Sequence, residues 1–151
     1  MIRAKKFWKK KINLIHWNKV PKNILEQNNK SKFCWFKDGK LNLFENCILQ
    51  NLKKNPNKTA IICYDKNKIE NKYTYSEINL AVNNFCRLLL KYKFKKNDVI
   101  AIHASASIES TVSMLACSKL GITFSVIFED LPLESILKRI EILNSKLFVT
   151  R

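Results

Sequence analysis

Residues 98–128, DVIAIHASASIESTVSMLACSKLGITFSVIF, contain the pattern that decides the fold. The apolar run at 98–103 predicts a buried strand, and residues 122–128 predict a second one. Between them, residues 108–120 predict a helix that ends at Gly121. Two strands joined by a helix of this length pair in parallel, and such a sheet carries helices on both faces. The stretch therefore predicts an α/β fold with a largely parallel sheet.

Periodicity and turn residues predict the elements on either side. Predicted helices lie at 4–17, 44–54, 76–91 and 133–143, and further strands lie at 59–64, 72–75 and 147–150. Ser76 is expected to cap the helix that it begins, and Asn55-Pro56 to end the helix before the first strand. Residues 18–34 are polar and are expected to form an arm or loop, and residues 65–71 a polar turn.

The composition fits a chain that folds around a core. Of 151 residues, 46% are hydrophobic and 11% are aromatic, which argues against general disorder. No apolar run approaches the roughly 20 residues that span a bilayer. No short apolar block followed by a cleavage site marks a secretory leader at the N-terminus. We therefore expect a cytoplasmic protein without a transmembrane segment.

The net charge of +16 comes almost entirely from lysine. A strongly basic chain can have a nucleic-acid or anionic-membrane partner. Lysine, asparagine and isoleucine are all abundant here, and A/T-rich codons encode all three, so codon bias accounts for much of the charge. We expect no specific nucleic-acid partner. The alternative is a basic membrane- or nucleic-acid-binding module, whose surface would be the lysines of the first predicted helix, at positions 5, 6, 9, 10 and 11.

The cysteines show no metal or disulfide pattern. The five positions are Cys34, Cys47, Cys63, Cys86 and Cys117. Their number is odd and no C-x-x-C pair occurs, so neither a disulfide framework nor a zinc site fits. We expect reduced, buried thiols and no bound metal.

Glycine is scarce, and this bears on nucleotide binding. Gly39 and Gly121 are the only two glycines in the chain. A loop that cradles phosphates needs several closely spaced glycines, because consecutive backbone N–H groups must approach the phosphate oxygens. The sequence therefore predicts no phosphate-binding loop of this kind.

One group of polar residues contains the side-chain types of a hydrolase site. His103, Ser105 and Ser107 follow a predicted strand, and Asp98 begins it. Neither a nucleophile elbow nor an oxyanion-hole signature accompanies them. We expect helix-capping serines and a strand-end histidine, and we assign no catalytic residue.

Residues 33–47, FCWFKDGKLNLFENC, resemble the entry segment W-F-x-G-G-x-L-N-x-x-x-N-C of the acetyl-CoA and propionyl-CoA synthetases. These are AMP-forming acid–CoA ligases of the adenylate-forming superfamily. Residues 98–102, 114–121 and 125–128 resemble the family's phrases D-R-V-A-I, M-L-A-C-A-R-I-G and S-V-V-F. The resemblance runs from about residue 7 to residue 150 and so covers nearly the whole chain.

The resemblance implies an N-terminal helical arm and a partial, largely parallel sheet flanked by helices, which is an incomplete adenylate-forming large domain. It places a synthetase-type N-terminal segment at 1–58 and the start of the AMP-binding domain at 59–151. Family members join an acid to ATP, with Mg²⁺, and capture the acyl-adenylate with CoA. The family's ATP loop and mobile C-terminal domain follow the matched part.

These implications predict an N-terminal fragment of an acid–CoA ligase that binds no cofactor and is inactive alone. The alternative is one chain of a split acyl-CoA synthetase. The expected partner is the remainder of the synthetase or a second copy of the chain.

The chain departs from the family pattern where the resemblance implies a ligand contact. The family's F-G-G lies against the nucleotide portion of CoA, and the matching residues here are Phe128, Glu129 and Asp130. Two carboxylates in place of two glycines would repel phosphates and fill the open space. Other family glycines are replaced at Asp38, Lys93 and Asn97. If the backbone is left-handed there, Asn97 tolerates it and Lys93 is strained.

Overall fold

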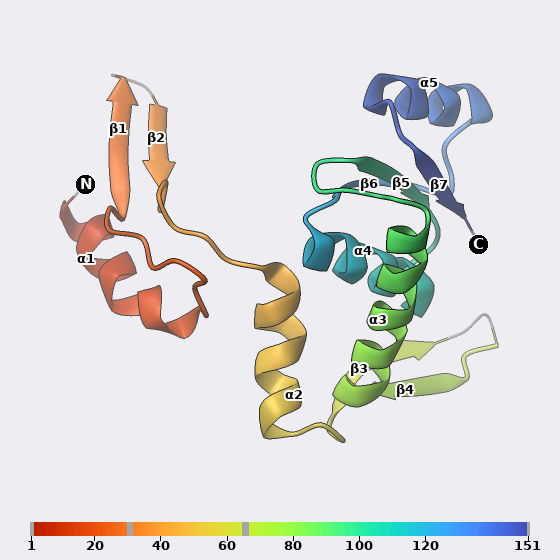
Figure 1. The fold of residues 1–151 in the computed structure, drawn as a ribbon, viewed down its shortest axis with the longest axis horizontal. Helices are drawn as coiled ribbons and strands as arrows, with labels where there is room; N and C mark the ends of the chain where they lie inside the picture. The colour runs from red at the N-terminus through yellow and green to blue at the C-terminus, as the bar shows by residue number, and fades with distance from the viewer. Residues whose placement is uncertain (1, 30–31, 65–66, 151) are drawn as a thin grey trace.

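The structure, a computed structural model, describes residues 2–29, 32–64 and 67–150. Three parallel strands form the central sheet in the order β6-β5-β7 (Figure 1). They are β5 (Val99–His103), β6 (Thr123–Ile127) and β7 (Leu147–Thr150). His103 at the end of β5 is in register with Ile127 and Thr150. The predicted α/β fold with a parallel sheet is confirmed.

Helices cover both faces of this sheet, as the alternation of side chains in β5 requires. Ile100 and Ile102 pack in one buried cluster with Leu89 of α3 (Tyr75–Lys91) and Cys117 of α4 (Ile108–Leu120). Ala101 points the other way and packs with Ile136 of α5 (Leu133–Leu143). Figure 1 shows α5 on one side of the sheet and α3 with α4 on the other.

The start of α3 differs from the sequence prediction. Its cap is Thr74, not Ser76. The Thr74 hydroxyl accepts from the backbone N–H of Glu77 at 3.2 Å, and the Glu77 carboxylate accepts from the Thr74 N–H at 2.7 Å. This reciprocal pair satisfies two N–H groups that a helix start leaves open. The hydroxyl of Ser76 instead donates to the carbonyl of Pro56.

A hairpin precedes α3. Its strands β3 (Thr59–Tyr64) and β4 (Glu70–Thr74) are antiparallel. The predicted second strand began at residue 72, but the pairing of Tyr64 with Glu70 starts it two residues earlier. Residues 65–66 of the predicted turn lie outside the described residues.

The N-terminal part contains a hairpin where a loop was expected. β1 (Leu25–Asn29) and β2 (Lys32–Trp35) pair antiparallel, so the prediction of an arm or loop at 18–34 was wrong for residues 25–29 and 32–34. The buried Leu25 lies opposite Trp35, and this tertiary contact outweighs the weak strand propensity of the Gln and Asn residues. The first helix is also shorter than predicted: α1 spans Ile2–Lys11, and the 3₁₀ turn η1 spans Ile12–Leu14.

A helix links this N-terminal part to the β3–β4 hairpin. It consists of a π-helical stretch, η2 (Glu45–Leu49), continued by α2 (Gln50–Lys54), and it ends at Asn55 before Pro56. The prediction of a helix at 44–54 is confirmed. None of the helices in the described residues is long and apolar enough to cross a bilayer.

At two of the positions where the family has glycine, the backbone is left-handed, which is a conformation that glycine favours. The φ angles of Lys93 and Asn97 are 61° and 72°, as expected from the family pattern. Asp38 does not have a positive φ; in that turn Phe36 does, at 49°. Lys93 carries the larger strain, because asparagine enters the left-handed region more readily than lysine.

Candidate functional site

The carboxyl edge of the parallel sheet is where an α/β fold places its ligands. His103, Ile127 and Thr150 lie side by side at this edge. The chain leaves β6 through an exposed turn, residues 128–130, before α5 begins. Phe128 is 73% exposed, and its carbonyl accepts from the N–H of Leu131 at 3.4 Å.

The chemistry of the turn does not suit a phosphate. Glu129 and Asp130 both expose carboxylates there, and no residue of the turn is a glycine that would let a phosphate approach the backbone. Two negative charges next to a phosphate would raise the free energy of binding rather than lower it. These residues therefore do not fit the CoA contact that the family resemblance implied for them.

His103 has an unusual environment at this edge. Its ring stacks on Phe148 of β7, with centroids 5.6 Å apart and planes at 18°. Its Nε2 atom is buried and has no hydrogen-bond partner among the described residues. Buried ring nitrogens without a partner are rare in folded proteins, because the nitrogen loses its bond to water.

The structure does not bring the hydrolase-type residues together. Asp98 and His103 lie at opposite ends of β5, roughly 16 Å apart at the usual rise of a strand. The Asp98 carboxylate instead pairs with the Lys146 amine at 2.6 Å and accepts from the Lys95 N–H at 2.7 Å. These bonds hold the pKa of Asp98 below its usual value, and the bond from Lys146 contributes most. Ser107 caps α4 in a reciprocal pair with Ser110, as expected of a helix-capping serine.

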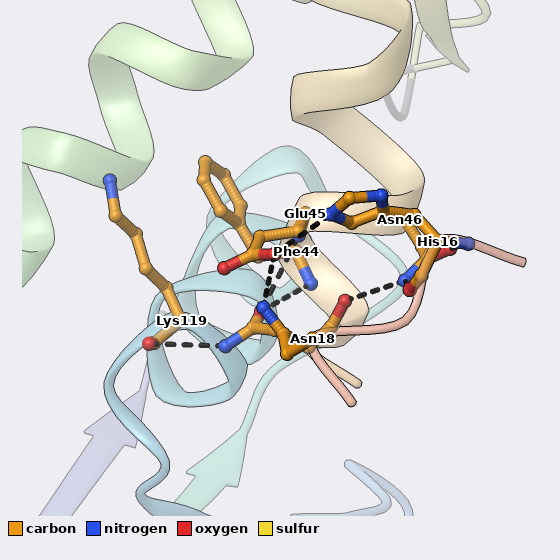
Figure 2. A network of polar contacts seen from close by, with 7 residues as sticks. His16, Asn18, Phe44, Glu45, Asn46 and Lys119 are labelled. Atoms are coloured by element: carbon orange, nitrogen blue, oxygen red, sulfur yellow. Dashed lines mark hydrogen bonds and ion pairs between the residues drawn. The ribbon is translucent and has the colours of Figure 1, made fainter. Parts of the chain in front are cut away.

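A second polar centre joins the N-terminal part to the sheet domain (Figure 2). The side-chain amide of Asn42 donates to the carbonyls of Ser118 at 3.0 Å and Lys119 at 3.3 Å, at the end of α4. Its oxygen accepts from the N–H groups of Phe44 at 2.9 Å and Glu45 at 3.4 Å. The Asn42 side chain therefore satisfies carbonyls at the end of α4 and N–H groups at the start of the helix that contains η2.

Asn46 extends this centre toward the N-terminus. The backbone N–H of His16 donates to its oxygen at 2.8 Å, and its amide donates to the His16 carbonyl at 2.9 Å. Asn18 donates to the Glu45 carboxylate at 2.8 Å, next to these bonds in Figure 2. Sequence reasoning gave these residues no role, although Asn42 and Asn46 are the two asparagines of the quoted family phrase.

Phe44 anchors the same junction through packing. Its ring is fully buried, in one cluster with Ile48 of η2 and Val82 of α3. The Lys119 amine lies 4.6 Å from the ring centroid, within the range of a cation–π contact.

The thiols are not all buried, contrary to expectation. Cys86 and Cys117 are buried and Cys47 is exposed, with Cys34 and Cys63 between these limits. Burial raises the pKa of Cys86, and it raises the pKa of Cys117 to about 11, so both remain protonated at neutral pH. No group of His, Cys, Asp or Glu within residues 2–29, 32–64 and 67–150 could hold a metal ion.

An apolar hollow of about 440 Å³ lies at the amino end of the parallel strands, opposite the carboxyl edge. Leu89, Phe94 and Leu147 line it, and the Asp98–Lys146 ion pair borders it. It is at the amino end of the strands and is therefore separate from residues 128–130.

Comparison with known proteins shows two matches in series. Residues 3–47 match the family model described as the acetyl-coenzyme A synthetase N-terminus, and residues 48–151 match that of AMP-binding enzymes. Acetyl-coenzyme A synthetase of Escherichia coli O157:H7 is 36% identical over 149 residues, or 95% of this chain and 23% of the relative. The Cupriavidus pinatubonensis protein of that name is 34% identical over 136 residues, or 89% of this chain and 21% of the relative. The chain thus spans less than a quarter of the length of these relatives.

Proposed function

Because the chain belongs to the AMP-binding enzyme family and corresponds to the N-terminal part of an acetyl-CoA synthetase, we propose that it is the N-terminal scaffold of an acid–CoA ligase. In this role it adenylates no acid by itself. It supports adenylation and thioester formation only together with the residues that follow this part in the family. We propose the cytoplasm as its location.

The observation that carries this proposal is the junction at Asn42. Asn42 lies in the segment that matches the synthetase N-terminus, and its bond partners Ser118 and Lys119 lie in the segment that matches AMP-binding enzymes. Phe44 and Asn46 reinforce the same contact. The two family segments are therefore held together as one scaffold.

Both glycines have structural roles, which supports the absence of adenylation by the chain alone. A Cβ on Gly39 would lie 2.7 Å from the Trp17 ring, so this position is closed by packing. Gly121 ends α4 with a left-handed φ of 69°. Neither is part of a loop of the kind that binds ATP phosphates.

Exposed apolar side chains support a partner that completes the enzyme. Phe128 lies exposed at the carboxyl edge, and Leu133, Leu137 and Ile142 lie exposed on α5. Leu133 and Leu137 are four residues apart and so share one side of α5, and exposed apolar surface favours association. We propose that the remainder of a synthetase, the residues that follow this part in the family, packs on this surface, and self-association is the alternative.

A transplant tests the scaffold role. The first quarter of the E. coli synthetase, the part that aligns with this chain, is replaced by residues 1–151. Because the junction and the core are formed within these residues, we expect the hybrid to make acetyl-CoA at a measurable rate. The control is the E. coli protein that lacks its first quarter. A folded hybrid that is no more active than this control would contradict the scaffold role.

A further inference from the structure

The positive charge is concentrated at the N-terminus rather than spread evenly. Residues 1–40 contain 12 Lys and Arg residues and two acidic residues, so they carry +10 of the net +16. Codon bias alone would distribute the charge in proportion to length. Both acidic residues of this part already have partners: Glu26 pairs with Lys37 at 3.2 Å, and the Asp38 carboxylate accepts from the N–H groups of Lys22 and Asn23.

Helix α1 carries the densest part of this charge. Its cations are Arg3, Lys5, Lys6, Lys9, Lys10 and Lys11, all of them exposed. The helix has no acidic residue, and none of these cations forms an ion pair within the described part of the chain. At 100° per residue, Lys5, Lys6, Lys9 and Lys10 share one side of the helix. We call these four lysines, together with Lys11 at the end of the helix, the basic face.

A row of exposed aromatic rings adjoins the basic face. Phe7 contacts Trp8 with centroids 5.2 Å apart, and Trp8 contacts Trp35 of β2 at 6.0 Å. The three residues are 54%, 41% and 42% exposed. The row therefore begins on α1 itself, and its rings are open to a partner.

We propose that α1 and this aromatic row bind an anionic lipid surface. Lysines attract acidic headgroups, and tryptophan and phenylalanine rings enter the region between headgroups and acyl chains. The charge complementarity and the adjoining rings fit such a surface better than a nucleic acid. The rings stand edge to face, at 87° and 66°, so they do not form the parallel platform on which bases stack. The helix also has only one arginine and no asparagine or glutamine to read base edges.

Tryptophan fluorescence of the chain can report this binding. All three tryptophans, Trp8, Trp17 and Trp35, lie in the N-terminal part. The test mixes the full chain with vesicles of phosphatidylcholine and phosphatidylglycerol, or of phosphatidylcholine alone, at physiological salt. We expect cosedimentation and a blue shift of tryptophan emission with the anionic vesicles only. Absence of both effects would overturn the proposal.

Two variants of equal net charge locate the binding surface. The first changes the basic face to glutamine at Lys5, Lys6, Lys9, Lys10 and Lys11. The control changes the same number of exposed lysines elsewhere, at Lys53, Lys54, Lys58, Lys91 and Lys138. We expect the first variant to weaken vesicle binding by more than about tenfold and the control by less than about threefold. Equal losses in the two variants would overturn the proposal, because bulk charge would then explain the binding.

Phe7→Ala separates a lipid surface from other polyanions. We expect it to weaken binding to anionic vesicles several-fold and to leave binding to duplex DNA unchanged, because only a bilayer offers an apolar phase to the ring. Circular dichroism checks that each variant folds like the parent chain. Tighter binding to DNA or single-stranded RNA than to the vesicles, or no effect of Phe7→Ala on vesicle binding, would overturn the proposal. Lipid binding is independent of the ligase scaffold, since none of these three tests measures ligase chemistry.

Discussion

Phe44→Ala is expected to lower the free energy of unfolding by about 3–5 kcal/mol, the usual cost of removing a buried aromatic ring. The ring is fully buried between η2 and α3, and the Lys119 amine lies over its face in a cation–π contact. A loss of this size is a large part of the roughly 5–15 kcal/mol that stabilises a typical domain. Urea unfolding followed by circular dichroism measures it.

The neighbouring residue provides the matched control. Leu43 is about half exposed, so Leu43→Ala should cost less than about 1 kcal/mol. Similar losses in the two variants would show that the N-terminal part does not depend on this junction for its packing.

Restoring two glycines in the transplant is expected to lower the KM for CoA by roughly thirtyfold. Replacing Glu129 and Asp130 by glycine removes two exposed carboxylates from the turn after β6. If this turn approaches the CoA phosphates, each carboxylate opposes binding by about 1 kcal/mol in a water-rich environment. The adenylation step does not use CoA, so ATP–pyrophosphate exchange should stay unchanged.

The control for this experiment changes the net charge equally at a different place. Glu134 and Glu141 lie exposed on α5, and Glu134→Gln with Glu141→Gln should leave the KM for CoA unaltered. Glu129→Gln with Asp130→Asn separates charge from side-chain bulk. An unchanged KM for CoA in the double-glycine variant would remove residues 128–130 from the CoA site.

The sequence predicts the sheet domain well, because its elements have strong local periodicity. The apolar strand β5 and the end of α4 at Gly121 can be predicted from neighbouring residues alone. The left-handed backbone at Lys93 and Asn97 is also predictable, since both replace a family glycine. The cap of α3 was missed by two residues because Ser76 and Thr74 are both good capping types. Only the position of Glu77 three residues later favours Thr74.

Contacts between distant segments explain what the sequence did not show. The β1–β2 hairpin contains Gln and Asn, which have low strand propensity, and forms where Leu25 is buried opposite Trp35. Asn42 bonds to Ser118 and Lys119, more than 70 residues away, and no local pattern encodes that distance. The stacking of His103 on Phe148 likewise joins two strands that are far apart in the sequence.

ATP–pyrophosphate exchange by the purified chain tests the central claim most directly. The assay supplies acetate or propionate with Mg²⁺ and ATP, and a heat-treated sample sets the background. The E. coli synthetase under the same conditions shows that the assay detects adenylation. The scaffold account predicts no exchange above background for residues 1–151 alone. Exchange above background that is lost on heating would contradict it and would show that these residues form an active enzyme by themselves.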